Sequence, residues 1–161
     1  MTTPTFRHTP DVLPEDPWER IPYPDAYLRA VLEGVRSIAV VGFSAKRARP
    51  SHDIALALKA RGYRVIPVNP GLAGQEFLGQ TVRASLADVP APVDLVDVFR
   101  NSDAAAEVVD EAIALAAGKG IGAVWLQSGI RSDGAAQRAE AAGLKVVMNR
   151  CLKVELARLH L

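Results

Sequence analysis

The sequence predicts an α/β protein, built as a doubly wound, Rossmann-like parallel sheet of about five strands with helices on both faces. Apolar, β-branched runs of about four residues recur along the chain, and such runs are typical of strands buried on both faces. Stretches with helical periodicity alternate with these runs, and no hairpin signal joins two strands. Alternation of this kind implies right-handed crossovers and a parallel sheet.

The expected strands are 37–41, 63–66, 95–99, 123–126 and 146–148. The expected helices are 26–33, 50–61, 102–117, 134–142 and 151–159. Four helices are followed by a glycine, at Gly34, Gly62, Gly118 and Gly143. Glycine best tolerates the left-handed backbone that ends a helix, so each of these residues predicts a helix end before the next strand.

Residues 1–24 contain six of the eleven prolines and predict an extended arm without regular structure. Trp18, Ile21 and Tyr23 could anchor this arm on its own domain or on a second subunit, so a homodimer stays open. The whole chain has 161 residues, an ordinary length for one domain, so residues 25–161 are expected to form a single domain.

Composition narrows the class of protein. Apolar residues make up 49% of the chain, charged residues 23%, and the net charge is +1. This balance offers no broad basic surface, so we expect no nucleic-acid partner. No apolar run is long enough for a membrane span or a signal peptide, and the single cysteine, Cys151, fits a reducing compartment. We therefore expect a cytoplasmic protein with no membrane partner.

The stretch 42–51 is the strongest candidate for a binding site. It follows the first predicted strand, contains Lys46, Arg47 and Arg49, and leads into the helix that begins at Pro50 and Ser51. The N–H groups of a first helical turn are unpaired, and the helix dipole favours negative charge there. In a doubly wound sheet, ligands bind where the strand order reverses. We expect that point between strands 37–41 and 95–99.

The residues around this point favour a particular class of ligand. The loop lacks the G-x-G-x-x-G pattern of dinucleotide-binding folds, and no P-loop motif is present. The second strand ends in Pro67-Val68-Asn69, without the acid that usually holds a ribose 2′-hydroxyl. An acid there would repel a phosphate on the ribose. Its absence, together with the cationic loop, favours NADP or coenzyme A (CoA).

Six segments of the chain resemble the small stand-alone CoA-binding proteins, whose fold is similar to the CoA-binding domain of the succinyl-CoA synthetase α subunit. The segments are Gly42-Phe43-Ser44, Arg49-Pro50-Ser51, Gly62-Tyr63 with Pro67 to Pro70, Asp94 to Arg100, Val124 to Ile130 and Met148 to Cys151. The resemblance covers about residues 25–159. The resemblance implies a Rossmann-like domain that binds CoA, with no settled reaction.

Resemblance and side-chain chemistry together suggest a role for each candidate residue. Ser44 and its neighbouring amides would hold the pyrophosphate, Lys46 and Arg49 would neutralise phosphate, and Ser51 would cap the helix. Three groups would border the rest of the ligand: Pro67, Val68 and Asn69 the adenine or its ribose, Phe99 and Arg100 the pantetheine side, and Gln127, Ser128 and Gly129 the far wall. Gly42, Phe43 and Pro50 complete the candidate set.

Other chemically active side chains receive structural interpretations. His52 is expected on the surface, Asp94 and Asp97 as hydrogen-bonded structural carboxylates, and Trp125 in the core. Cys151 is either a packed thiol or a neighbour of the pantetheine thiol. The chain offers no metal-ligand spacing, so no metal site is expected.

The leading functional expectation is a non-catalytic or regulatory protein that binds CoA or acyl-CoA. Two enzymatic alternatives stay open: an NADP-linked or acyl-CoA-handling enzyme, and a CoA-thiol redox protein that acts through Cys151. A structural protein whose proline-rich arm embraces a partner is the third reading. No histidine has a visible nucleophile partner in the sequence, which disfavours the enzymes.

Overall fold

The computed structural model describes residues 4–161 and contains a five-stranded, fully parallel sheet. Its strands are β1 (Ser37–Val41), β2 (Arg64–Val68), β5 (Leu95–Val98), β6 (Ala123–Leu126) and β7 (Lys145–Val147). They lie in the order β2-β1-β5-β6-β7. The predicted fold class is therefore confirmed, and the chain reverses direction across the sheet between β1 and β5, as expected.

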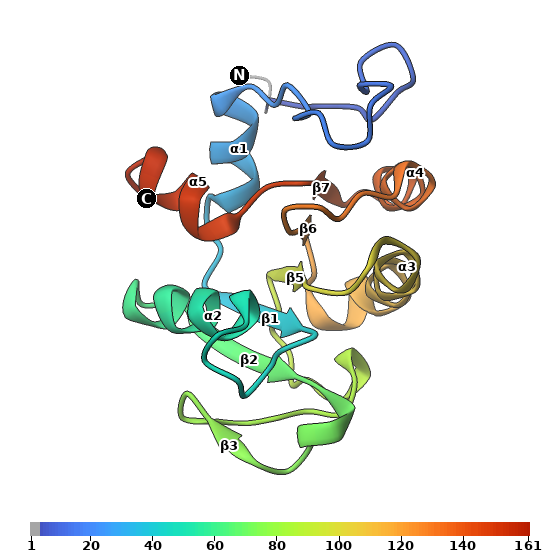
Figure 1. Cartoon of the computed structure of the whole chain (residues 1–161). Coiled ribbons are helices and arrows are strands. Elements are labelled where there is room, and N and C mark those ends of the chain that lie inside the picture. The colour runs from blue at the N-terminus through green and yellow to red at the C-terminus, as the bar shows by residue number, and fades with distance from the viewer. Residues whose placement is uncertain (1–3) are drawn as a thin grey trace.

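Helices cover both faces of the sheet. They are α1 (Asp25–Leu32), α2 (Pro50–Ala60), α3 (Ser102–Lys119), α4 (Asp133–Ala141) and α5 (Leu152–Arg158). Figure 1 shows α3 and α4 on one face, and α2 and α5 with α1 on the other. No helix within residues 4–161 combines the length and the hydropathy that crossing a bilayer requires.

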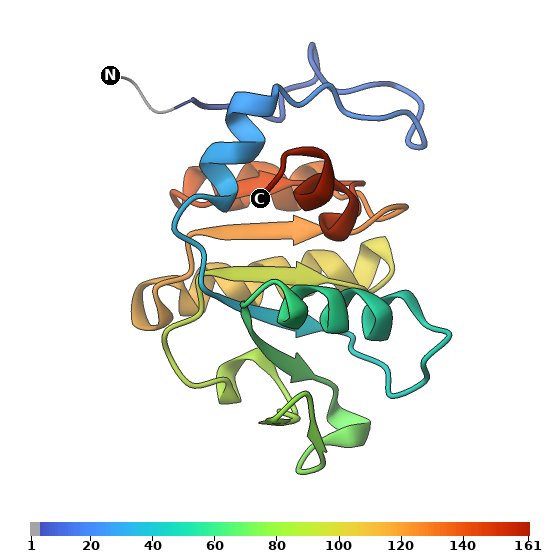
Figure 2. The same cartoon turned by 90° about the vertical axis from the view of Figure 1, so that its left-hand side faces the viewer.

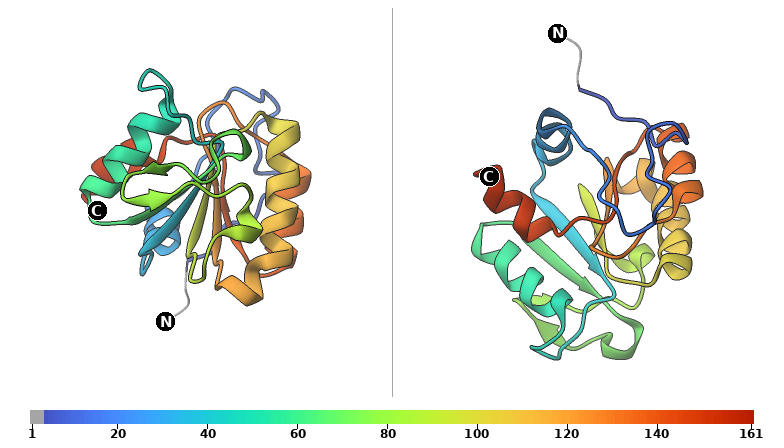
Figure 3. Two further views of the ribbon diagram at one scale, coloured as in Figure 1. Left: turned by 90° about the horizontal axis from the view of Figure 1, so that it is seen from below. Right: turned by 45° about the horizontal axis from the view of Figure 1, so that its top comes forward.

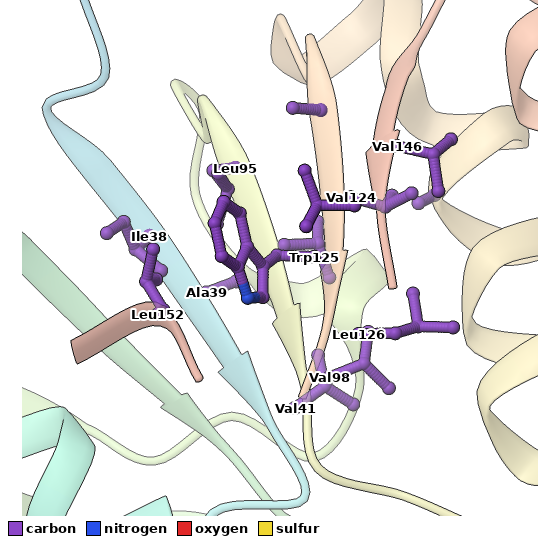
Figure 4. Close-up of a cluster of buried hydrophobic side chains, with 14 of the residues drawn as sticks. Ile38, Ala39, Val41, Leu95, Val98, Val124, Trp125, Leu126, Val146 and Leu152 are labelled. Carbon is purple, nitrogen blue, oxygen red and sulfur yellow. The ribbon is translucent and has the colours of Figure 1, made fainter. Parts of the chain in front are cut away.

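The core is formed by side chains that alternate between the two faces of the sheet. All residues of β1, β5 and β6 are buried, as expected for parallel strands covered by helices. Trp125 lies with Ile38 and Leu152 on the face of α2 and α5, whereas Val98 and Leu126 point toward α3 and α4 (Figure 4). Trp125 is fully buried and its indole N–H donates to the carbonyl of Arg150, so its expected place in the core is confirmed.

All five strands point the same way, and the segments that follow them lie together at the carboxyl ends of the strands, along one side of the sheet (Figure 2). The loop after β1 and the bend of the N-terminal arm both reach this edge. Because β1 and β5 are direct neighbours, with Val41 opposite Val98, the residues that follow these two strands lie side by side. The fold thus brings segments of the binding-site prediction together.

Two features of the fold differ from the sequence interpretation. A small antiparallel hairpin, β3 (Glu76–Phe77) and β4 (Gln80–Thr81), lies between β2 and β5 and is visible beside β2 in Figure 3, left. Helix α3 passes through Gly118 and ends at Lys119, and the next residue, Gly120, adopts the left-handed conformation with φ +77°. The expected end at Gly118 was therefore two residues early.

The arm packs on its own domain and covers the exposed edge of β7 (Figure 3, right). The Tyr27 hydroxyl donates to the carbonyl of Val146 (2.7 Å) and accepts from its N–H (3.0 Å). The Tyr23 hydroxyl accepts from the N–H of Met148 (2.8 Å). Edge strands expose unpaired backbone groups, and these two tyrosines satisfy them here. Of the expected anchors, Ile21 and Tyr23 are buried, whereas Trp18 is exposed.

Candidate functional site

A pocket of about 340 Å³ lies at the point where the strand order reverses. It is called the central pocket below. Its lining comes from the segments after β1, β5, β6 and β7 and from the first turns of α2: Gly42, Arg49, Pro50, Ser51, Ile54, Phe99, Gln127, Ser128, Ile130 and Cys151. Seven of these ten residues are among the sequence candidates. The exceptions are Ile54, Ile130 and Cys151.

A second pocket of about 200 Å³, called the β2-side pocket, opens on the other side of Gly42. Val68, Pro70, Ser85 and Arg100 contribute to its walls. Gly42 lines both pockets and has φ +88°. A Cβ atom at this residue would lie 3.2 Å from the carbonyl carbon and oxygen of Phe99. Glycine is required here for both reasons, and it lets the segments after β1 and β5 approach closely.

The loop between β1 and α2 is held in shape by its own hydrogen bonds. The N–H of Ser44 donates to the hydroxyl of Ser51 (3.0 Å), and the ring of His52 bonds the carbonyl of Ser44 (2.9 Å). The N-cap residue of α2 is Arg49, with no side-chain cap. Ser51 therefore does not cap the helix as expected, because its hydroxyl accepts from the loop instead.

His52 is buried rather than on the surface, which corrects the sequence interpretation. Its ring stacks on Phe43 with 5.6 Å between the ring centroids. Asn69 supports the same segment, since its side-chain amide donates to the carbonyl of Phe43 (2.7 Å). The side chain of Phe43 is fully buried and lines neither pocket. Phe43, His52 and Asn69 thus fix the loop from beneath.

The cations of the loop are free to meet a ligand. Lys46, Arg47 and Arg49 are exposed, and none of them forms an ion pair with any residue in 4–161. The acid of the first turn, Asp53, pairs with Lys153 (3.0 Å). Its negative charge is thereby offset, and the repulsion of a phosphate near the helix axis is weakened.

Backbone donors are also open at the start of α2. Within the described part of the chain, the N–H groups of Ala45 and Ser51 donate to no other residue. The N–H of Ser44 is occupied by Ser51, so it is not free to bind a ligand, whereas the neighbouring amides are.

The other sequence candidates lie at varying distances from the pockets. Pro67 is buried within β2 and lines neither of the two pockets. Ser44 and the exposed Lys46 also line neither pocket. Gly129 lines a separate pocket under the N-terminal arm. The structure thus brings most of the candidates to one edge of the sheet and leaves Pro67 inside it.

A buried acid lies behind the central pocket. Asp97 on β5 is fully buried and accepts from the side-chain amide of Gln127 (2.8 Å), while its second oxygen has no partner among residues 4–161. Burial raises the pKa of Asp97 to about 8, and the hydrogen bond from Gln127 opposes this rise. The acid is therefore largely protonated at neutral pH and uncharged.

Asp94 lies at the opposite end of the same strand. It accepts from the N–H groups of Arg36 (2.8 Å) and Ser37 (3.0 Å). Its pKa is lowered: burial raises it, but the hydrogen bonds from Arg36 and Ser37 outweigh that effect. Asp94 directly precedes β5 and is a hydrogen-bonded carboxylate, as expected. Asp97 lies within β5 and also accepts a hydrogen bond, but it is protonated and its second oxygen has no partner among the described residues.

Comparison with known proteins gives the family. Residues 36–157 match the model of the family described as CoA binding domain. The chain belongs to this CoA-binding family. It is 35% identical over 129 residues to the uncharacterized protein YneT of Bacillus subtilis (strain 168), covering 80% of this chain and 91% of that protein. It is also similar to the structure of cell-free ID.343 from Thermus thermophilus, with a TM-score of 0.78 and 43% identity, covering 85% of this chain and 99% of the other.

A larger protein contains a similar domain. Over 102 residues the chain is 33% identical to the acetate–CoA ligase (ADP-forming) II of Archaeoglobus fulgidus. The match covers 62% of this chain and 14% of the ligase, so this chain corresponds to a small part of that protein. The resemblance to stand-alone CoA-binding proteins is thereby confirmed, and the arm before residue 36 lies outside the matched region.

Proposed function

We propose that the protein binds one molecule of CoA across Gly42, with its adenosine end in the β2-side pocket and its pantetheine arm in the central pocket. The observation that supports this most is the pair of pockets that meet at Gly42, at the edge of the sheet where a doubly wound fold binds ligands. An elongated ligand with two different ends suits two neighbouring pockets better than one compact ligand does.

Charge supports the same orientation. CoA carries a pyrophosphate near its middle and a further phosphate on the adenosine ribose. Lys46, Arg47 and Arg49 project from the loop next to Gly42 without ion-pair partners among the described residues. The open N–H groups of Ala45 and Ser51 add donors. Cations beside a helix N-terminus form a suitable site for phosphate groups.

We propose further that the protein performs no reaction on its own and serves as a CoA-binding or regulatory module. Within the described chain, the walls of the central pocket contain no histidine, lysine or carboxylate. These are the side chains that most often act as general acid or base, and Cys151 is the one other titratable side chain in these walls apart from Arg49. Asp97 is close by, but it lies behind Gln127 and its raised pKa keeps it protonated at neutral pH.

Calorimetric titration with CoA and dephospho-CoA tests the proposal. We expect micromolar or tighter binding of CoA and much weaker binding of dephospho-CoA, which lacks the ribose phosphate. Lys46→Ala and Arg49→Ala should each weaken CoA binding by about ten- to a hundredfold, since a hydrogen bond to a charged group is worth about 1.5–3 kcal/mol.

The matched control is Lys59→Ala, which removes an exposed cation near the far end of the same helix. It should leave the affinity unchanged. Equal affinity for CoA and dephospho-CoA would show that the protein does not bind the ribose phosphate. Equal losses in all three variants would show that the cationic loop does not bind phosphate.

A second candidate function is thiol exchange with CoA disulfide. It is favoured by Cys151, which lines the central pocket, is partly exposed and precedes α5. Its thiolate would attack one sulfur of CoA disulfide, form a protein–CoA mixed disulfide and release the second CoA as a thiolate. Intact-protein mass spectrometry should then show an adduct of one CoA that dithiothreitol removes. Failure of the wild-type protein to form it, or its formation in Cys151→Ser, would exclude this function.

A further inference from the structure

The N-terminal arm adds a third pocket to the site. This pocket, called the arm pocket, has a volume of about 260 Å³ and shares Ser128 and Cys151 with the central pocket. Its other walls are Trp18 and Arg20 of the arm, Asn149 and Arg150 after β7, and Val154 and Glu155 of α5. The arm pocket is therefore a continuation of the proposed pantetheine site, at the end away from Gly42.

Two large apolar side chains in this pocket are exposed. Trp18 has 75% of its surface accessible and Val154 has 55%. The other exposed large apolar residues within 4–161 are Val12, Leu56 and Leu161, and none of them lines the arm pocket. Two exposed apolar side chains in one small pocket indicate a ligand with an apolar group.

The backbone on both sides of Trp18 is fixed by the domain. Arg131 donates to the carbonyls of Pro14 (2.8 Å) and Asp16 (3.3 Å). The N–H of Trp18 itself donates to the side chain of Asp16 (2.9 Å). Beyond it, Arg150 donates to the carbonyl of Ile21 (2.6 Å). An exposed aromatic side chain on a fixed backbone loses little conformational entropy when a ligand covers it.

The one acid of the arm pocket in the described chain, Glu155, already bonds both of its arginines. Glu155 accepts from Arg20 (3.1 Å) and from Arg150 (3.1 Å), and Arg158 also contacts it (2.7 Å). A carboxylate on the ligand would have to compete with Glu155 for these guanidinium groups. The apolar surface of Trp18 and Val154 is the free part of the pocket, so an uncharged group fits it better.

A neighbouring pocket of about 470 Å³ also touches Trp18, but it suits an acyl chain less well. It shares no residue with the central pocket, and its walls include Glu15 and the Arg131–Asp133 ion pair. The route from the central pocket past Ser128 and Cys151 leads directly to the arm pocket.

We infer that Trp18 is a specificity-determining residue for the acyl group of a CoA thioester, and that the arm makes the protein prefer uncharged, short-chain acyl-CoA over free CoA. The inference rests on the proposed CoA function. The thioester sulfur would lie near Ser128 and Cys151, and the acyl chain would cover the indole of Trp18 and the side chain of Val154. The arm precedes the region that matches the family model.

Calorimetry of the full-length protein with CoA, acetyl-CoA, butyryl-CoA, hexanoyl-CoA and succinyl-CoA tests the inference. Burial of one methylene group strengthens binding by up to about fourfold. We expect affinity to rise from CoA through acetyl-CoA to hexanoyl-CoA, by at least tenfold overall, with succinyl-CoA below butyryl-CoA. Trp18→Ala should bind CoA as tightly as the wild type, but its affinity should not rise with the length of the acyl chain. Trp18→Phe should retain part of this rise.

Leu56→Ala is the matched control, because Leu56 is an exposed apolar residue outside the arm pocket; it should retain the full increase. Tryptophan fluorescence gives a second readout. Trp18 and Trp125 are the two tryptophans of the chain, and Trp125 is fully buried. A blue shift with hexanoyl-CoA that is absent with CoA, and lost in Trp18→Phe, would place the acyl chain on Trp18.

Several results would overturn the inference. One is equal affinity of the wild type for all uncharged ligands, another is stronger binding of succinyl-CoA than of butyryl-CoA, and a third is an equal loss for CoA and hexanoyl-CoA in Trp18→Ala. A dimer in solution that Trp18→Ala converts to a monomer would show that a second copy covers the indole instead. Failure of the proposed CoA function is distinguishable, because no CoA thioester and no CoA would then bind to the wild type.

Discussion

Replacement of Gly42 by alanine tests whether the approach of β1 to β5 builds the site. Gly42 has φ +88°, and an added Cβ would lie 3.0 Å from Cδ of Arg100 and 3.2 Å from the carbonyl of Phe99. A left-handed backbone costs an L-residue about 1–2 kcal/mol. Overpacking against neighbours that cannot move freely costs about 1–3 kcal/mol more. Gly42→Ala should therefore lower the free energy of unfolding by about 2–5 kcal/mol.

Gly62→Ala separates the two contributions. Gly62 has φ +96°, but an added Cβ would meet no atom within 4 Å. This variant should lose only the backbone contribution of about 1–2 kcal/mol. The difference between the two variants in urea-induced unfolding then measures the steric conflict at Gly42 alone.

Binding gives the second half of this test. Measured at a temperature where both variants are folded, Gly62→Ala should bind CoA like the wild type. Gly42→Ala should bind it at least tenfold more weakly, because Phe99 and Arg100 must move and both line the pockets. Equal losses of stability in the two variants, or wild-type CoA affinity in Gly42→Ala, would refute the reasoning.

Three further predictions concern the sheet edge, the buried acid and the ligand. Tyr27→Phe should lower the free energy of unfolding by about 1–3 kcal/mol, because it leaves both backbone groups of Val146 unpaired; Tyr63→Phe, whose hydroxyl bonds no described residue, should change it by less than about 0.5 kcal/mol. The pKa of Asp97 is raised to about 8, so its contribution to stability is lost as the pH rises from about 4 to 8. Asp97→Asn removes this loss, so the free energy of unfolding of the variant relative to wild type should rise by about 1.4 kcal/mol per pH unit between about pH 4 and 8. A difference that does not change with pH would contradict a protonated Asp97 in the folded protein. CoA affinity should fall between about 0.1 and 1 M salt, which shortens the screening length from about 10 to 3 Å, and salt-independent binding would contradict a phosphate site.

The sequence predicted the central strands well because they are buried on both faces. Residues 38–41 and 123–126 are uninterrupted apolar runs, and the structure places strands over them. The hairpin β3–β4 was missed for a physical reason. Its strands have two residues each, and its turn uses Leu78 at φ +57° beside Gly79, in place of the Asn-Gly or Asp-Gly that signals such a turn.

The candidate site was predictable where backbone position decides it. Gly42, Phe99 and Gln127 follow three neighbouring parallel strands, so fold class alone brings them together. Side-chain partners were less predictable. His52 was expected on the surface, yet the stacking on Phe43 and the bond to Ser44 make it part of the loop's support. No pattern in the sequence encodes these contacts, because they depend on how the loop folds back on α2.

The arm shows the same limit. Its prolines predicted an extended segment without regular structure, but its place on the sheet edge depends on tertiary contacts. Tyr23 of the arm and Tyr27 of the adjoining α1 bond the backbone of Met148 and Val146, more than a hundred residues away. The contact of Trp18 with the arm pocket follows from these anchors, and so could not be read from the sequence.

A crystal structure of the protein with CoA tests the central claim most directly. We predict one CoA per chain, with its pyrophosphate against the amides of residues 45–51, its adenosine on the β2 side of Gly42 and its sulfur near Ser128 and Cys151. Density for CoA at any other surface, with residues 42–51 free of phosphate, would contradict the account.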